Sequence, residues 1–170
     1  MEISAKIISQ ADTAKLLDFE LENRQWFEKH IPPRLDSFYS LSGVQSQIET
    51  FLEQYENETL IPMLLWTPDG ELCGRLNLTI DESEPTVGIL GYRVGERFTR
   101  QGVASQAISL IQQYIVQFTE ITTLKAIALT SNIGSSKALE NNGFNKESNI
   151  KNFVLLNGRH EDANEYIWTH

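Results

Sequence analysis

The chain has 170 residues, of which 41% are hydrophobic, and its formal net charge is −9 at pH 7. This length and composition predict one compact domain, residues 1–170, and exclude a disordered chain. No apolar stretch approaches the ~18 residues of a membrane span, so we expect no membrane partner. Nucleic-acid binding is also disfavoured, because it depends on many lysine and arginine contacts to phosphates.

The residue types present also limit the compartment, the metals and the partners. MEISAKIISQADTAK, the N-terminal segment, lacks the basic start and apolar block of a signal peptide, so we expect a cytoplasmic protein. The lone Cys73 agrees with a reducing compartment, and the three histidines show no metal-ligand spacing, so no metal is expected. An acidic surface favours a cationic partner such as an amine, although many acidic domains have no such partner.

The first half of the chain predicts strands and helices that end in a β-hairpin. The predicted elements are a strand at Ala5–Ile8, a helix from Asp12 to before Pro32, a helix at Ser46–Glu58, and strands at Ile61–Thr67 and Leu72–Ile80. Pro68–Asp69–Gly70 is the turn of the hairpin. Trp26, Phe27 and His30 either line a substrate pocket or, as the simpler alternative, belong to the core and the surface.

The second half predicts further strands on both sides of two helices. Its elements are a strand that begins at Val87, a helix from about Gln101, a strand at Leu124–Leu129, a short helix within Asn132–Phe144, and strands at Asn152–Leu156 and Tyr166–Trp168. Strands flank helices throughout, so the pattern predicts a single α/β domain with a mixed sheet.

The junction between the strand at Val87 and the helix that follows predicts an anion site. Free N–H groups and the helix dipole attract negative charge at a helix start, and Gly102 and Ala104 are small enough to let a ligand approach. Arg97 and Arg100 precede this start, where a positive charge costs up to about 1 kcal/mol unless an anion is bound. The alternative is that they point to water or pair with Glu96. Neither a Walker-type loop nor a dinucleotide-binding motif is present.

Two segments together resemble the GNAT superfamily of N-acetyltransferases. The first motif of the family, Q/R-x-x-G-x-G/A, corresponds to Thr99-Arg100-Gln101-Gly102-Val103-Ala104, with Thr99 in place of the leading Gln or Arg. The second motif corresponds to Asn132, Ser135, Leu139, Gly143 and Phe144. Finer details are similar to the subgroup that acetylates the N-termini of ribosomal proteins, namely Leu90-Gly91-Tyr92 and the ending Asn157-Gly158-Arg159…Asp162…Tyr166.

The resemblance implies a fold and a co-substrate. The fold is a central mixed, mostly antiparallel sheet, flanked by helices, whose middle strands splay apart at the acetyl-CoA site. The co-substrate is acetyl-CoA, with its diphosphate at the turn and its pantetheine arm against the strand near Gly91. The residues that the resemblance assigns to acetyl-CoA are Tyr92, Arg93, Val94, Arg97, Thr99, Arg100, Gln101, Gly102, Val103, Ala104, Asn132 and Ser135.

The catalytic groups are less well specified. Ser135 is the catalytic candidate, because the ribosomal subgroup implies that its hydroxyl assists the leaving thiolate; the alternative is that it caps the short helix. The tyrosine acid of many family members corresponds to Leu139, and a glutamate of some members corresponds to Val154. Water or an acid of the Asp81–Pro85 loop, Glu82 or Glu84, remains as the base.

The acceptor is expected to be an amine that needs little help to lose its proton. Near pH 7.4, deprotonating a lysine costs roughly 4 kcal/mol and an α-amine under about 1 kcal/mol. We therefore expect an acetyl-CoA-dependent N-acetyltransferase of protein N-termini, such as those of ribosomal proteins. The alternatives are acetylation of a small amine (a polyamine or an aminoglycoside) and a non-catalytic acyl-CoA-binding module. The family often forms homodimers, but no stripe in the sequence identifies an interface.

Overall fold

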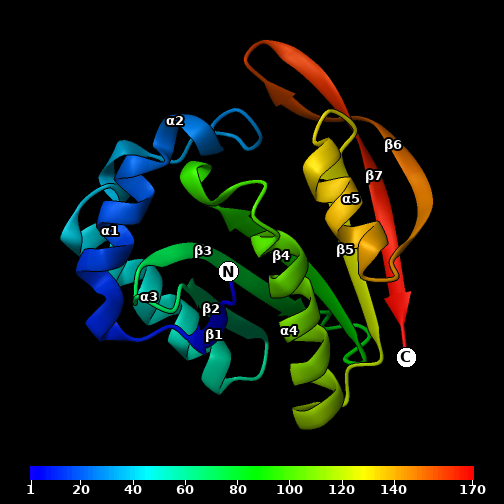
Figure 1. Cartoon of the computed structure of the whole chain (residues 1–170), viewed down its shortest axis with the longest axis horizontal. Coiled ribbons are helices and arrows are strands. Elements are labelled where there is room, and N and C mark those ends of the chain that lie inside the picture. The colour runs from blue at the N-terminus through cyan, green and yellow to red at the C-terminus, as the bar shows by residue number, and fades with distance from the viewer.

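A seven-stranded sheet forms the centre of the computed structural model, which describes residues 1–170 (Figure 1). The strand order is β1-β2-β3-β4-β5-β7-β6, and only β4 and β5 are parallel. The strands are β1 (Ser4–Ile7), β2 (Leu60–Trp66), β3 (Leu72–Ile80), β4 (Val87–Val94), β5 (Thr123–Leu129), β6 (Asn145–Leu156) and β7 (Arg159–Thr169). The prediction of a mixed, mostly antiparallel sheet is confirmed.

Five α-helices and three short 3-10 helices complete the fold. The α-helices are α1 (Thr13–Glu22), α2 (Arg24–Phe27), α3 (Leu41–Glu56), α4 (Val103–Phe118) and α5 (Ile133–Asn141). The 3-10 helices are η1 (Gln10–Asp12), η2 (Asp36–Phe38) and η3 (Glu96–Phe98). No helix combines the length and the apolar character that crossing a bilayer requires.

The helices cover the two faces of the sheet unequally. Figure 1 shows α4 and α5 in front of the sheet. On this face, Leu76 and Leu78 of β3 join Ile108 and Ile111 of α4 in the main core. The opposite face of the N-terminal strands packs against α1 and α3 in a second core. On that opposite face of β5, Ile127 is 41% exposed, so the covering helices stop short of the C-terminal half.

The two halves of the sheet separate between β4 and β5. These strands pair only along Val87–Leu90 and Thr123–Ala126. Both strands continue past the pairing, to Val94 and to Leu129. Because paired strands lie only about 4.8 Å apart, the loss of pairing opens a gap at the carboxyl ends of both strands. The predicted divergence of the two middle strands is confirmed.

Two helices differ from the sequence prediction because of local hydrogen bonds. The first helix is interrupted at Asn23, whose amide donates to the carbonyl of Phe19 at 2.9 Å and accepts from the N–H of Glu96 at 2.8 Å. The helix α3 begins before the predicted Ser46, because the Ser40 hydroxyl accepts from the N–H of Gly43 at 3.0 Å and caps the helix.

The last two strands are longer than predicted. Most residues of β6 are polar or exposed, and the strand lies at the edge of the sheet, so it carries no alternation of apolar and polar residues. Its pairing with β7 is also irregular between Ile150 and Val154, where Asn152 has a positive φ of 50°. Hydrophobic periodicity therefore detects only part of this hairpin.

Candidate active site

An edge of β4 borders the gap. From Gly91 to Val94 this strand pairs with β3 on its other side, but it has no partner on the side of β5. No atom lies within 4 Å of the position that a Cβ would take on Gly91, so the space beside it is open. The indole of Trp26 donates to the carbonyl of Val94 at 3.2 Å and closes the far end of the edge. The edge thus offers backbone groups to an extended ligand.

The aromatic residues near the end of the first helical segment have separate environments. Phe27 is buried in the core beneath α1 and α3, and Trp26 is half-buried against the same core while its indole bonds the carbonyl of Val94. His30 is half-buried and stacks edge-on against Trp26, with ring centroids 5.3 Å apart. The structure therefore confirms the core alternative for Phe27, and Trp26 both packs against that core and borders the β4 edge.

The turn between β4 and α4 has a backbone shaped for an anion. Arg100 and Gly102 both adopt left-handed conformations, with φ of 60° and 78°. The backbone N–H groups of residues 100–105 have no acceptor in the protein, and the first satisfied one is that of Gln106, which donates to the carbonyl of Gly102 at 3.0 Å. A row of free amides at the positive end of a helix dipole is a site for a negatively charged group.

Protein packing does not explain the glycine at this turn. A Cβ on Gly102 would meet only the Nε2 of Gln106, at 3.8 Å. The positive φ and the need to expose the free amides account for it instead. The next two predicted residues begin α4, where Val103 is buried and Ala104 is half-buried. In both residues the backbone N–H group has no acceptor in the protein.

Side chains within the turn brace it. The hydroxyl of Thr99 donates to the carbonyl of Glu96 at 2.7 Å. The amide of Gln101 donates to the carbonyl of Arg97, also at 2.7 Å. Thr99 therefore keeps the chain folded where the family has Gln or Arg, and both residues act on the shape of the turn.

The two arginines of the turn differ in their partners. Arg97 lies 3.3 Å from Glu71 and 3.7 Å from Glu22, and its side chain is 55% exposed. Arg97 does not pair with Glu96, although such a pair was one alternative predicted from the sequence. Arg100 is exposed and forms no ion pair. Arg100 is therefore free to meet an anion at the start of α4, whereas Arg97 would share its charge with two carboxylates.

A hydroxyl pair spans the gap from β4 to α5. The Tyr92 hydroxyl and the Ser135 Oγ lie 2.8 Å apart, although 43 positions separate them in the sequence. Asn132 caps α5 by accepting from the N–H of Ser135 at 3.2 Å. Burial raises the pKa of Tyr92 to about 12, against the opposing effect of the bond to Ser135, so the phenol is protonated at neutral pH. The cap is thus Asn132, and the hydroxyl of Ser135 is left for Tyr92.

The residues considered for acid or base catalysis are placed unfavourably. Leu139 is fully buried in the main core. Val154 packs against a small apolar cluster at the end of β5. Glu82 and Glu84 precede the first residue of β4, at the end where β4 and β5 are paired. Four strand residues, about 13 Å, separate that end from Gly91, so neither loop acid lies beside the open gap.

One acid that the sequence reasoning missed lies on the open face. Glu165 of β7 is opposite Ile127 of β5, which places both on the same face of the sheet as Gly91. It is half-buried, and its carboxylate has no hydrogen bond or ion pair. The strand that carries it was predicted only from the next residue, Tyr166, so its face could not be assigned.

A second group of arginines surrounds a buried carboxylate. Glu20 of α1 is 1% exposed, and its oxygens lie 2.5 Å from Arg75, 2.8 Å from Arg34 and 3.6 Å from Arg93. Burial alone would raise the pKa of Glu20, but the three guanidinium charges outweigh burial and hold this pKa below its usual range. We call these four residues the inner arginine group.

This group changes the role of one predicted residue. Arg93 was assigned to acetyl-CoA, but its side chain turns toward Glu20 and lies over the ring of Phe27, 5.1 Å from the centroid. Only its backbone belongs to the β4 edge. Two signals could have revealed the group: Glu20 lies among the buried residues of its helix, and Arg75 is the one charged residue of β3.

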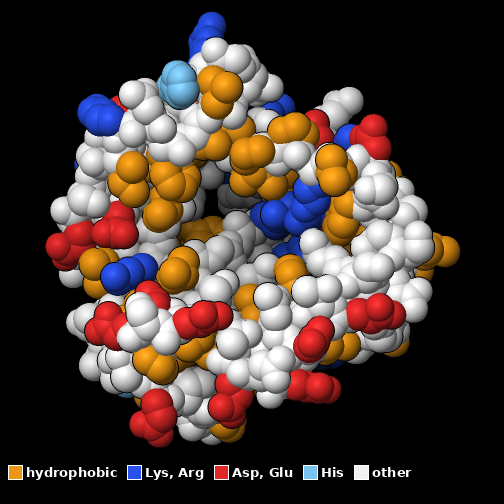
Figure 2. Space-filling model, turned by 180° about the vertical axis from the view of Figure 1, so that it is seen from behind, with side chains coloured by type: hydrophobic (Ala, Val, Ile, Leu, Met, Phe, Trp, Pro, Cys, Tyr) orange, Lys and Arg blue, Asp and Glu red, His pale blue; other side chains and the backbone are white.

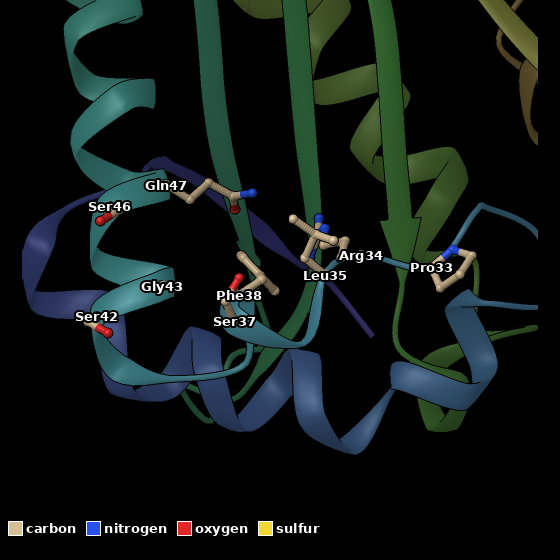
Figure 3. Close-up of a pocket in the computed structure, with 9 residues that line it drawn as sticks. All are labelled: Pro33, Arg34, Leu35, Ser37, Phe38, Ser42, Gly43, Ser46 and Gln47. Carbon is tan, nitrogen blue, oxygen red and sulfur yellow. The ribbon is translucent and has the colours of Figure 1, made fainter.

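Two hollows of the surface bear on the site. Figure 2 shows a depression near the middle of one face, with hydrophobic side chains around it and Lys or Arg side chains on one wall. The second hollow, of about 740 Å³, lies beside the 33–38 loop and the first turns of α3 (Figure 3). Arg34 and Gln47 line it, and the Gln47 side-chain oxygen accepts from Arg75 at 2.7 Å. It thus borders the inner arginine group.

The fold and the site together define an acyltransferase that binds a nucleotide-linked coenzyme. The free amides before α4 can donate to an anion, and the unpaired β4 edge can donate to and accept from an extended ligand. Residues 7–145 match the family model described as an acetyltransferase (GNAT) domain. The chain belongs to the GNAT acetyltransferase family, and it is an N-acetyltransferase with acetyl-CoA as the donor.

Known proteins of this kind are similar over nearly the whole chain. A probable N-acetyltransferase of Bacillus subtilis, YjcK, is 26% identical over 162 residues, which are 94% of this chain and 90% of that protein. The ribosomal-protein-S5-alanine acetyltransferase of Vibrio fischeri superposes with a TM-score of 0.92 at 18% identity, over 99% of this chain and 93% of the other. RimL, a ribosomal L7/L12 α-N-protein acetyltransferase in complex with coenzyme A, superposes with a TM-score of 0.87 at 19% identity, over 98% and 93%.

Proposed function

We propose that the protein acetylates the N-terminal α-amine of another protein, such as a ribosomal protein. The observation that carries this proposal is that the single buried acid, Glu20, is held by three guanidiniums and is therefore a poor base. An α-amine costs under about 1 kcal/mol to deprotonate near neutral pH, whereas a lysine costs roughly 4 kcal/mol. The site suits the acceptor that needs the weaker base.

The names of the structural neighbours support the same acceptor. One compared structure is named for an alanine of ribosomal protein S5, and the other is named as an α-N-protein acetyltransferase of ribosomal L7/L12. Their fold covers nearly all of this chain. Neither of the two names mentions a polyamine or an aminoglycoside.

The turn before α4 and the β4 edge would bind different parts of the donor, acetyl-CoA. The amides of residues 100–105 and the side chain of Arg100 would hold the diphosphate. The unpaired edge from Gly91 to Val94 would hydrogen-bond the amides of the pantetheine arm. Asn132, at the start of α5, would border the same arm from across the gap. The coenzyme supplies the activated acetyl group.

For the leaving group, Ser135 is the catalytic residue and Tyr92 is a positioning residue. The Ser135 hydroxyl would donate a hydrogen bond to the sulfur as the thiolate leaves. The protonated phenol of Tyr92, 2.8 Å away, would donate to the Ser135 oxygen and fix its rotamer. The proton of the acceptor ammonium would leave to water or to Glu165, which lies on the open face.

Purified protein, acetyl-CoA and matched peptides test this function. Hexapeptides that begin with Ala or Ser should release free CoA thiol with a kcat/KM at least about 100-fold above that of the same peptides with a blocked N-terminus and an internal lysine. A preference for lysine or for a polyamine would contradict the proposal. Binding of CoA without turnover across all these amines would instead indicate a non-catalytic module.

A pair of serine variants tests the catalytic assignment. Ser135→Ala should lower kcat by about 10–100-fold and change the KM for acetyl-CoA little, because the lost hydrogen bond forms in the transition state. Ser131→Ala, an exposed neighbour before α5, is the matched control and should retain wild-type kcat. Equal kcat values for the two variants would remove Ser135 from the mechanism.

A further inference from the structure

The inner arginine group carries more positive than negative charge. Three guanidiniums, those of Arg34, Arg75 and Arg93, face one carboxylate, that of Glu20. Glu20 is the one carboxylate that acts on Arg93. The other groups that act on it are the cations Arg34 and Arg75 and the phenol of Tyr39. The group therefore has a net charge of +2, because all three arginines share the single carboxylate of Glu20.

The uncompensated charges are the ones that reach solvent. Arg75 is 4% exposed and pairs with both Glu20 and Gln47, so it completes a buried ion pair. Arg34 and Arg93 are 22% and 26% exposed. The Nη1 of Arg34 lies near Glu20 but makes no hydrogen bond, although it is buried. A structural ion pair would need one arginine, and the other two remain available to a ligand.

The available arginines lie next to the open gap. Arg93 follows Gly91 by two positions on β4, so both point to the same face, about 7 Å apart along the strand. Arg34 lines the hollow beside the 33–38 loop. An acceptor that enters from this face would have its second or third residue near these guanidiniums when its amine lies near Gly91.

Nearby cations do not show the same excess. Arg24, which is close to this region in the sequence, is held by Glu28 at 3.1 Å and Asp36 at 2.5 Å. Lys29 lies over the ring of Trp26 and 4.0 Å from Glu96. The local excess is thus confined to Arg34 and Arg93, in a protein whose net charge is −9. The overall negative charge of the protein suggests a cationic partner. Arg34 and Arg93, by contrast, favour a single negatively charged group on that partner.

We propose that Arg34 and Arg93 bind a negatively charged side chain at the second or third position of the acceptor. The recognised group is an oxyanion, either the carboxylate of Asp or Glu or a phosphate on Ser. Guanidinium groups bind both in a two-pronged geometry. This inference rests on the proposed function, because it takes the acceptor to be a peptide whose α-amine lies in the gap.

Acid and amide peptides of equal shape test the inference. Hexapeptides that begin with Ala and carry Asp at position 2 or 3 should be acetylated with a kcat/KM at least about 10-fold above that of the Asn versions. Phosphoserine and serine at the same positions distinguish a phosphate from a carboxylate as the preferred oxyanion. Equal rates for every acid and amide pair would overturn the inference, even if all of the peptides are acetylated.

Charge-matched variants locate the site. Arg34→Gln should reduce the acid-to-amide ratio to below about 3-fold, through a higher KM for the acidic peptide, and Arg34→Lys should restore part of it. Lys15→Gln also removes one positive charge, but from a lysine that lies over Trp66, and it should keep the wild-type ratio. If both Gln variants keep that ratio, Arg34 does not form the site.

A binding measurement separates this inference from the proposed function. Calorimetry with the N-acetylated acidic hexapeptide, which has no free α-amine, needs no turnover. Its affinity should fall about 10-fold in Arg34→Gln and should be unchanged in Lys15→Gln. If no peptide is acetylated but this difference is found, the anion site stands and the proposed acceptor fails. Equal affinities in the wild type and Arg34→Gln overturn the anion site.

Discussion

The protein contains two groups of arginines that differ in how their charge is balanced. The inner group surrounds Glu20 and includes a fully desolvated ion pair with Arg75. The outer arginines, Arg97 and Arg100, lie at the turn before α4, are exposed, and are balanced weakly or not at all. The buried ion pair of the inner group therefore contributes to the fold, whereas the role that we propose for the outer group is ligand binding. Burial, and not the number of arginines, separates the two roles.

Removing the inner carboxylate should produce the largest effect. Glu20→Gln leaves three guanidiniums around a neutral amide, so the free energy of unfolding should fall by about 3–5 kcal/mol. Glu71→Gln removes an exposed partner of Arg97 and should change it by under about 1 kcal/mol. Urea unfolding of the two variants measures both values. Similar losses would erase the distinction between the two groups.

Filling the turn should affect the ligand far more than the fold. Gly102→Glu places an acid among the free amides, so the affinity for acetyl-CoA should fall about 100-fold. Gly70→Glu is the control, because Gly70 also has a positive φ, of 80°, and nothing within 4 Å of its Cβ position. Both variants should lose about 1 kcal/mol of stability through backbone strain. An unchanged affinity in Gly102→Glu would remove the diphosphate from this turn.

Replacing Arg100 should move stability and affinity in opposite directions. Arg100 has a φ of 60°, which an L side chain adopts at a cost, and it has no ion pair to offset that cost. Arg100→Gly should raise the free energy of unfolding by about 0.5–1 kcal/mol and weaken acetyl-CoA binding by about 10-fold. Thermal unfolding and calorimetry measure the two changes. A decrease in both the free energy of unfolding and the affinity for acetyl-CoA would mean that Arg100 stabilises the turn in the absence of an anion.

Lowering the pH should reveal the contribution of the inner arginine group as a slope in the free energy of unfolding against pH. The folded pKa of Glu20 lies below its unfolded value, so its contribution is complete above the unfolded pKa of about 4.3 and is lost as the pH falls through the folded pKa. The slope from this group is at most about 1.4 kcal/mol per pH unit. Urea unfolding from pH 6 to pH 3 should show this slope in the wild type. Glu20→Gln, where it folds, should show a shallower one.

The sequence predicts the outer group and misses the inner one for a physical reason. Gly102, Arg97 and Arg100 lie within one short turn, so local spacing is enough to place an anion site there. Glu20, Arg34 and Arg75 come from α1, from the loop before η2 and from β3, and only the packing of these three segments brings them together. Spacing along the chain contains no signal for such a cluster.

The same limit applies to the hydroxyl pair and to the strands. Tyr92 and Ser135 were each selected by family motifs, but their 2.8 Å contact depends on how α5 docks beside the gap. Glu165 was not selected, because the edge hairpin that carries it has little apolar periodicity. By contrast, β3 and α4 were predicted well, since both bury apolar residues at regular spacing.

The short pairing between β4 and β5 suggests that the enzyme could be split there into a sensor for acetyl-CoA. These strands share four residue pairs, whereas β5 pairs with β7 along seven. Cutting the chain after Phe118 would yield two fragments that meet along this brief seam and along the contact of α5 with α4, where Asn142 bonds Ser105 at 2.8 Å. Acetyl-CoA bound as proposed would touch both fragments and clamp them together. Reassembly of such a split enzyme would then report the concentration of its own coenzyme.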